Sequence, residues 1–122
     1  MEIDIMMACT TFSSKEKARN CCKRLIEAKL VVCAQICGPI DSIYSWDGKI
    51  SEELEWRVVM KTSVSKIYKL KEEVMRTHEY ETPQWVSWKV TASSEYGSWV
   101  ESATEASGLV LTKETTRSPS FH

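Results

Sequence analysis

The sequence has little of several residue types that particular functions require. Only four glycines occur in 122 residues, and the segment CTTFSSKEK, after the first apolar stretch, contains none. A phosphate cradle of the acylphosphatase kind would need glycine and arginine there. Only two histidines are present, His78 and His122, so acid–base catalysis has few candidate residues, and no pattern marks a nucleophile. These absences favour a protein that is not an enzyme.

An excess of charge of one sign is also lacking. The formal net charge is −1 and the pI is about 6.1, so the chain offers no basic surface to polyanions. The aromatic strings that RNA-recognition domains carry on their central strands are absent. The longest apolar stretch, LVVCAQIC, is far shorter than the roughly 18 residues of a membrane span. We therefore expect neither nucleic acid nor a membrane among the partners.

Cysteine, in contrast, is comparatively common. The sequence has five, an odd number that cannot pair completely within one chain: Cys9, Cys21, Cys22, Cys33 and Cys37. The start, MEIDIMMAC, is acidic and lacks the basic segment and apolar run of a secretory signal. We expect reduced, mostly buried thiols in a cytoplasmic protein, folded as one domain that requires neither disulfides nor a metal.

Hydrophobic periodicity predicts an initial strand and helix. Residues 3–9 alternate with period two, and the odd-numbered side is predicted to be the better buried one. Ser13, followed by Glu16 at the third position, has the spacing of a capping box at a helix start. The amphipathic pattern that follows predicts a helix ending near Lys29.

A long hairpin is predicted in the middle of the chain. Gly38-Pro39 interrupts an apolar run and predicts a bulge or bend, and Asp47-Gly48 is a strong signal for a tight hairpin turn. The return strand reads as about 11 residues, well above the usual length of about 5–6. The tip of such a hairpin should extend beyond a small domain.

The remaining segments complete the predicted fold. SVSKIYKLKEEVMRTH reads as a second helix, QWVSWKV as a strand and SSEYGSWVESATEA as a last helix. Right-handed crossovers then place both main helices on one face of an antiparallel sheet. This predicts an α+β, ferredoxin-like βαββαβ sandwich with a long central hairpin and a C-terminal helix, over residues 1–106. Residues 107–122 form a polar C-terminal tail, for which a short accessory strand and a mobile end both remain open.

Five strings occur in the order and spacing of the divalent-ion tolerance (CutA) family. They are CTTFSSKEKA, KLVVCAQI, SIYSWDGKISEELEWRVVMKT, HEYETPQWVSWKV and YGSWVESA. Over about residues 3–105 the chain therefore resembles CutA proteins. The most specific string is Tyr-x-Trp-x-Gly-Lys, followed by a glutamate and a Lys-Thr pair, at Tyr44, Trp46, Gly48, Lys49, Glu55, Lys61 and Thr62.

The resemblance implies a compact homotrimer with the plan of PII signalling proteins. Its subunits would be joined through the long hairpins, with Tyr44, Trp46, Gly48, Lys49 and Glu55 as the hairpin residues of the trimer. The implied function is binding of, or tolerance to, divalent metals, copper in particular, with no catalytic reaction. The alternative is a non-catalytic trimeric scaffold that binds protein partners and whose metal binding is incidental.

The same resemblance implies a metal site at Cys9 and His78. A thiolate and an imidazole suit copper. The chain departs from the family at Glu79, where many members have proline, and at Thr77, where some have a second histidine. The alternative is that Cys9 is a small buried hydrophobe and His78 a helix-end residue, since a closed site wants about four ligands.

A second candidate site is a cleft between subunits. Lys61 is predicted to line it with Glu79, Tyr80 and Glu81 and to bind small anions there. The alternative for Lys61 is a strand-end residue with a packed stem and an exposed head. Among the tryptophans, Trp56 and Trp88 are expected in the core, and Trp46, near the hairpin turn, is expected to contact a neighbouring subunit.

Overall fold

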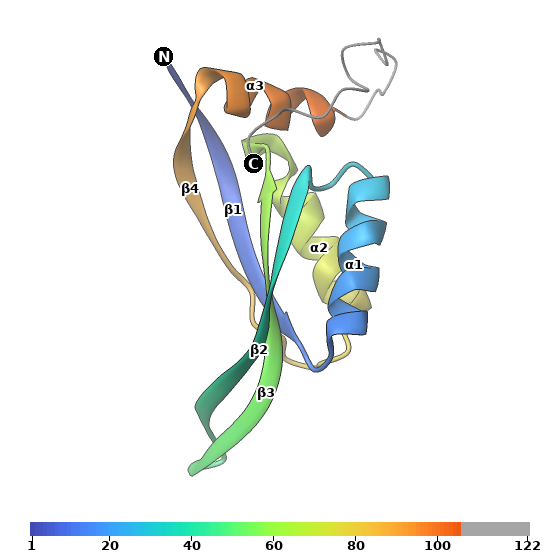
Figure 1. The fold of residues 1–122 in the computed structure, drawn as a ribbon, viewed down its shortest axis with the longest axis vertical. Helices are drawn as coiled ribbons and strands as arrows, with labels where there is room; N and C mark the ends of the chain where they lie inside the picture. The colour runs from blue at the N-terminus through green and yellow to red at the C-terminus, as the bar shows by residue number, and fades with distance from the viewer. Residues whose placement is uncertain (106–122) are drawn as a thin grey trace.

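The computed structural model describes residues 1–105, and the chain folds there into four strands and three main helices (Figure 1). In chain order these are β1 (Glu2–Phe12), α1 (Lys15–Glu27), β2 (Cys33–Trp46), β3 (Lys49–Thr62), the short 3-10 helix η1 (Val64–Lys66), α2 (Ile67–Thr77), β4 (Val86–Ser93) and α3 (Ser94–Ala103). The strands pair antiparallel in the order β2-β3-β1-β4. The predicted α+β, ferredoxin-like fold with a C-terminal helix is confirmed. The predicted tail, residues 107–122, lies outside the described residues.

α1 begins one residue later than the capping pattern predicts. Ser14, not Ser13, is the N-cap, and its hydroxyl accepts a hydrogen bond from the backbone N–H of Lys17 at 3.1 Å. The helix ends at Glu27, and Lys29 then adopts a positive φ of 60°. Such a left-handed residue commonly terminates a helix, so the predicted end near Lys29 is confirmed.

The two faces of the sheet are covered by different helices. α1 and α2 pack on one face, where Ala8 and Phe12 of β1 join the main hydrophobic core. α3 lies across one end of the sheet (Figure 1), and Gly97 approaches Ile3 there. The prediction that the odd-numbered side of β1 is the better buried one over residues 3–9 is confirmed, because Ile5 and Cys9 are buried whereas Asp4 is exposed. From Ala8 onward β1 is buried on both faces, and its even-numbered residues Ala8 and Phe12 belong to the core beneath α1 and α2.

The long hairpin is present and extends past the rest of the sheet (Figure 1). β2 and β3 have 14 residues each, so the return strand is longer than predicted. Asp47 and Gly48 form the predicted turn, with φ of 52° and 73°. The register of the β2–β3 pair shifts between Cys37 and Ile40, which confirms the predicted irregularity there. Because β1 ends opposite Trp56, the distal part of the hairpin has no third strand beside it.

Of the two tryptophans expected in the core, Trp56 packs there and Trp88 does not. Trp56 packs against the main core, as expected, but is only half-buried. Trp88 remains 40% exposed. It pairs with Met7 and therefore projects from the face that α1 and α2 do not cover. Trp85, just before β4, packs against the core instead.

Candidate functional site

His78 is held by hydrogen bonds at both ring nitrogens. The backbone N–H of Tyr80 donates to Nδ1 at 3.0 Å, and Nε2 lies 2.9 Å from the carbonyl oxygen of Thr11 and 3.1 Å from the hydroxyl of Thr10. Because Nδ1 accepts, the ring proton is on Nε2, which donates to Thr11. The ring also stacks on Phe12, with centroids 4.4 Å apart. The imidazole is thus pinned to the end of β1.

The surroundings of His78 favour the neutral imidazole. Burial lowers the pKa of His78 below its ordinary value. The hydrogen bond to Thr11 and the negative charges of Glu79 and Glu55 oppose this shift without reversing it. His78 therefore stays uncharged at pH 7 and keeps the tautomer that its hydrogen bonds require.

Glu79 joins the loop after α2 to the start of α1. Its carboxylate accepts hydrogen bonds from the Ser13 backbone N–H at 2.8 Å and the Ser13 hydroxyl at 2.6 Å. It also pairs with the ammonium of Lys17 at 3.1 Å. Burial acts to raise the pKa of Glu79, but these hydrogen bonds and the Lys17 charge outweigh it and lower the pKa of the carboxyl. Glu79 therefore tethers this loop near the N-terminus of α1, where a negative charge is favourable.

Tyr80 connects the same loop to the base of the hairpin. Its hydroxyl donates to Oε2 of Glu55 at 2.9 Å, and Glu55 is only 8% exposed. Burial and the neighbouring Glu55 carboxylate raise the pKa of Tyr80 well above its ordinary value, so the phenol stays protonated and can donate. We call His78, Glu79, Tyr80 and Glu55 the clasp.

Glu79→Gln should destabilise the protein at neutral pH and have little effect in acid. The lowered pKa means that the carboxylate stabilises the fold above the ordinary carboxyl pKa, and that this contribution is lost as the pH falls through the folded-state pKa. We expect a loss of about 1 kcal/mol at pH 7, because a charged hydrogen bond becomes a neutral one. Thermal melts of both proteins at pH 7 and pH 3 measure it. An equal difference at both pH values would contradict the role of the charge.

Cys9 lies on the opposite face of the sheet from His78. Thr10 and Phe12, two even-numbered residues of β1, both contact His78 on the α1/α2 face. Successive strand residues point to opposite faces, so the odd-numbered Cys9 points to the other one. Cys9 instead lies beside Gln84, whose amide is 3.9 Å from Sγ. Burial raises the pKa of the Cys9 thiol, and the charge of Arg57 offsets part of this rise.

The structure therefore does not bring Cys9 and His78 together within one chain. Both nitrogens of His78 are occupied, and the two side chains are separated by the sheet. Among residues 1–105, no group of three or more His, Cys, Asp or Glu side chains is arranged to hold a metal ion. The two residues do not fit a shared copper ion in a single protomer.

The predicted cleft residues also separate into two groups. Lys61 donates to Oε1 of Gln35 at 3.3 Å and lies 5.6 Å from the ring centre of Tyr96, beside α3. It is six positions from Glu55 along β3, about 20 Å at the rise of a strand, so it is remote from the clasp. Glu79 and Tyr80 belong to the clasp, and Glu81 is exposed close by. Within one chain, Lys61 therefore fits the alternative interpretation, that of a half-buried strand residue with a packed stem.

The hairpin residues form an exposed surface that includes several large apolar side chains. Gly48 and Lys49 lie at the tip, and Glu55 at the base. Tyr44 is 38% exposed and Trp46 is 60% exposed. Sequence reasoning missed three aliphatic residues that the pairing register places together on the other face of the hairpin, namely Ile43, Ile50 and Leu54. Leu54 stands in the alternating stretch of β3, but Ile43 is followed directly by Tyr44, so β2 shows no clear alternation that would have marked it.

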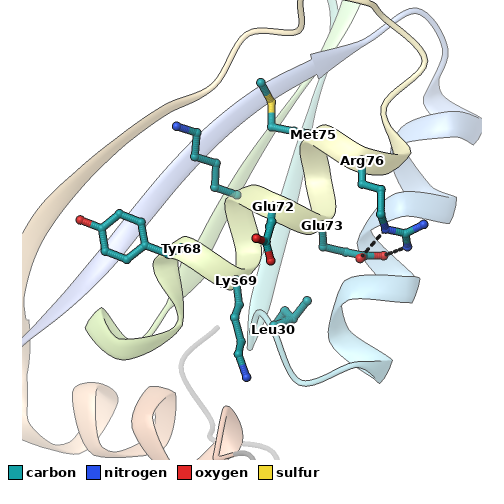
Figure 2. A pocket seen from close by; sticks show the side chains of 8 residues that line it. Leu30, Tyr68, Lys69, Glu72, Glu73, Met75 and Arg76 are labelled. Carbon is teal, nitrogen blue, oxygen red and sulfur yellow. Dashed lines mark hydrogen bonds and ion pairs between the residues drawn. The ribbon is translucent and has the colours of Figure 1, made fainter.

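A shallow groove of about 870 Å³ runs along the outer surface of α2 (Figure 2). Its labelled side chains point away from the helix in different directions, and the Glu73–Arg76 ion pair, at 2.7 Å, closes on itself. Ligand sites usually have a few convergent polar groups, and this groove lacks them among the described residues. The lining residues, which sequence reasoning did not predict as a site, are Leu30, Tyr68, Lys69, Lys71, Glu72, Glu73, Met75 and Arg76.

No helix within residues 1–105 is long and apolar enough to cross a membrane.

Several curated relatives of this chain are named for tolerance to divalent cations. The chain is 35% identical over 95 residues to the divalent-cation tolerance protein CutA of Thermus thermophilus, covering 77% of this chain and 92% of the relative. It is 30% identical over 95 residues to the chloroplastic protein CutA of Arabidopsis thaliana, again over 77% of this chain. The match spans only 52% of that plant relative, about half of its length.

Solved structures and a family model agree with these relatives. CutA from Synechococcus elongatus superposes with a TM-score of 0.80 at 28% identity, over 86% of this chain and 96% of that one. The Thermus thermophilus structure gives a TM-score of 0.76 at 33% identity, over 86% of this chain and 100% of that one. The family model for the CutA1 divalent ion tolerance protein matches residues 6–103. The chain therefore belongs to the CutA1 divalent ion tolerance family.

Proposed function

We propose that the chain acts as a trimeric, non-catalytic protein that binds divalent metal ions, with the PII-like plan of the family resemblance. The observation that carries the proposal is the long hairpin, whose large apolar side chains are exposed on a single chain. Exposed apolar patches of this kind mark protein interfaces. The names of the relatives, which refer to tolerance of divalent cations, support the metal part of the proposal.

The sheet topology supports assembly through the hairpin. β2 and β4 are the two edge strands of the sheet, so each presents backbone N–H and C=O groups on one side. The distal part of β2 extends beyond β1 and can reach another subunit. In this arrangement Trp46 and Tyr44 pack on a neighbouring chain, and Glu55 stays at the base, where the clasp holds it.

Cys9 is the one metal ligand that a single chain contributes in this proposal. Its thiol faces the side of the sheet that α1 and α2 leave uncovered, and a soft thiolate suits copper. Further ligands then have to come from outside the protomer. The five cysteines are free thiols, which suits the reducing cytoplasm that we propose as the location.

Cys9→Ser should weaken copper binding at least about tenfold, and the wild-type affinity should rise with pH. Burial raises the pKa of the thiol, so a metal ion must displace its proton. Below that pKa, the affinity should increase by up to about tenfold per pH unit. Isothermal titration of the reduced protein between pH 6 and pH 8 measures both effects. Cys37→Ser is the matched control. It makes the same thiol-to-hydroxyl change at an exposed cysteine. An affinity that Cys9→Ser leaves unchanged would refute Cys9 as a ligand.

The scaffold alternative is favoured by a specific observation. No cluster of three metal-ligating side chains occurs within residues 1–105, while the groove on the outer surface of α2 stays open to other proteins when the hairpin lies between subunits. Native mass spectrometry with and without copper and zinc separates the two functions, because it reports subunit number and bound metal together. A trimer that takes up no metal would favour the scaffold.

A further inference from the structure

We infer that His78 is a positioning residue in this chain, which fixes the base of the long hairpin through Tyr80, and that it is not a metal ligand. The inference goes beyond the proposed function, because it assigns a role to the clasp that holds whether or not the trimer binds metal. It rests on the two occupied ring nitrogens, on the separation from Cys9, and on the hydrogen bond from Tyr80 to Glu55.

A metal ion at either nitrogen of His78 would have to displace a hydrogen bond within the protein. Binding at Nδ1 would leave the backbone N–H of Tyr80 without its acceptor. Binding at Nε2 would remove the proton that is donated to the Thr11 carbonyl. Each displacement leaves a partly buried polar group unsatisfied, and the stacking on Phe12 holds the ring in the plane that makes these bonds. The imidazole is therefore committed to the protein itself.

The clasp transmits the position of His78 to the hairpin. His78 accepts from the backbone N–H of Tyr80, which sets the course of the loop two residues on. The hydroxyl of Tyr80 then donates a hydrogen bond to Glu55. In the β2–β3 ladder Glu55 pairs with Ile40, the first paired residue of β2 beyond the register shift. At this level β1 has ended, so the clasp takes the place of a third strand beside the hairpin.

Glu79, the remaining residue of the clasp, attaches the loop to the start of α1. Its bonds to Ser13 and Lys17 attach the loop to the start of α1, immediately after the β1 residues that His78 contacts. The loop is thus fixed to the end of β1, to α1 and to β3 within three consecutive residues. This arrangement sets the angle at which the hairpin leaves the sheet.

The test compares amide hydrogen exchange at the hairpin base with copper affinity, in the full chain. His78→Asn keeps an acceptor for the Tyr80 N–H, in the manner of an Asx turn, but loses the reach to Thr11. His78→Ala removes both the acceptor for the Tyr80 N–H and the donor to Thr11, and Tyr80→Phe removes only the hydroxyl that binds Glu55. Amide and phenyl groups are poor copper ligands, so each variant also removes any copper ligation by the replaced group.

We expect exchange at residues 53–57 to accelerate about fivefold in His78→Ala and in Tyr80→Phe, the effect of losing one hydrogen bond. His78→Asn should recover part of the protection. The double variant His78→Asn, Tyr80→Phe should exchange no faster than Tyr80→Phe alone, because both act through one contact. Amides of α3 should not change, since a general loss of stability would accelerate them as well.

Copper affinity should change less than about twofold in the His78 variants, compared with the loss of about tenfold expected for Cys9→Ser. A tenfold loss in His78→Asn would overturn the inference, and so would hairpin exchange that is insensitive to Tyr80→Phe. If Cys9→Ser also leaves copper binding unchanged, the metal function fails, while the exchange results still decide the role of His78.

Discussion

Replacing both Ile43 and Ile50 by glutamate is expected to convert the proposed trimer into monomers. The two side chains are 63% and 82% exposed on a single chain and lie on the same face of the hairpin. If they are buried between subunits, each contributes about 1.5–3 kcal/mol of hydrophobic stabilisation per chain, and a buried carboxylate adds a further cost. Sedimentation velocity over a range of concentrations should show at least about a hundredfold weaker association.

The matched control is Lys69→Glu, which adds a carboxylate on the outer surface of α2, away from the hairpin. It should leave the trimer intact. Circular dichroism of the double variant should remain that of a folded chain, because the replaced side chains contribute little to the core of a protomer. A wild-type protein that sediments as a monomer would refute assembly through the hairpin, and a double variant that stays trimeric would remove the face with Ile43 and Ile50 from the interface.

Gly97→Ala is expected to lower the free energy of unfolding by about 1–2 kcal/mol. A Cβ at this position would lie 2.7 Å from Cβ of Ile3, closer than side-chain atoms pack, so α3 must move away from β1. Replacing glycine by alanine inside a helix normally gains about 1 kcal/mol, and overpacking of this kind costs about 1–3 kcal/mol. The steric cost is larger because the contacts are to the branched side chain of Ile3 in the central strand β1. Denaturant unfolding measures the balance.

Ser98→Ala is the matched control for Gly97→Ala. Ser98 is the next residue of α3 and is exposed, so alanine there should be neutral or slightly stabilising. A Gly97→Ala protein as stable as wild type would mean that α3 can shift away from Ile3 without loss of packing.

The fold was predictable because its signals are local. The Asp47-Gly48 turn, the break at Gly38-Pro39 and the helical periodicities each depend on a few adjacent residues, and each was found in place. Burial was less predictable, because it depends on which element covers which face. Trp88 has the sequence pattern of a core residue, but its pairing with Met7 turns it away from α1 and α2.

The candidate site was predicted as a set of residues and not as an arrangement. The resemblance directed attention to Cys9 and His78, but the alternation of β1 places them on opposite sides of the sheet. Spacing along the sequence could not show this, because His78 reaches β1 from a loop nearly 70 positions away. Glu79 illustrates the same limit. Its departure from proline was visible, but its bonds to Ser13 and Lys17 depend on the tertiary fold.

The overhanging hairpin also has a consequence for how the chain reaches its assembled state. Its strands are adjacent in sequence and can pair early, within microseconds for a typical hairpin, whereas β1 and β4 must meet across most of the domain. The apolar hairpin surface is thus exposed before any subunit can cover it, which invites aggregation. Asp41 and Glu52 flank Ile43 on that same face, and like charges on two such hairpins repel. Acidic residues beside an exposed apolar strand are expected to reduce such non-specific association of newly made chains.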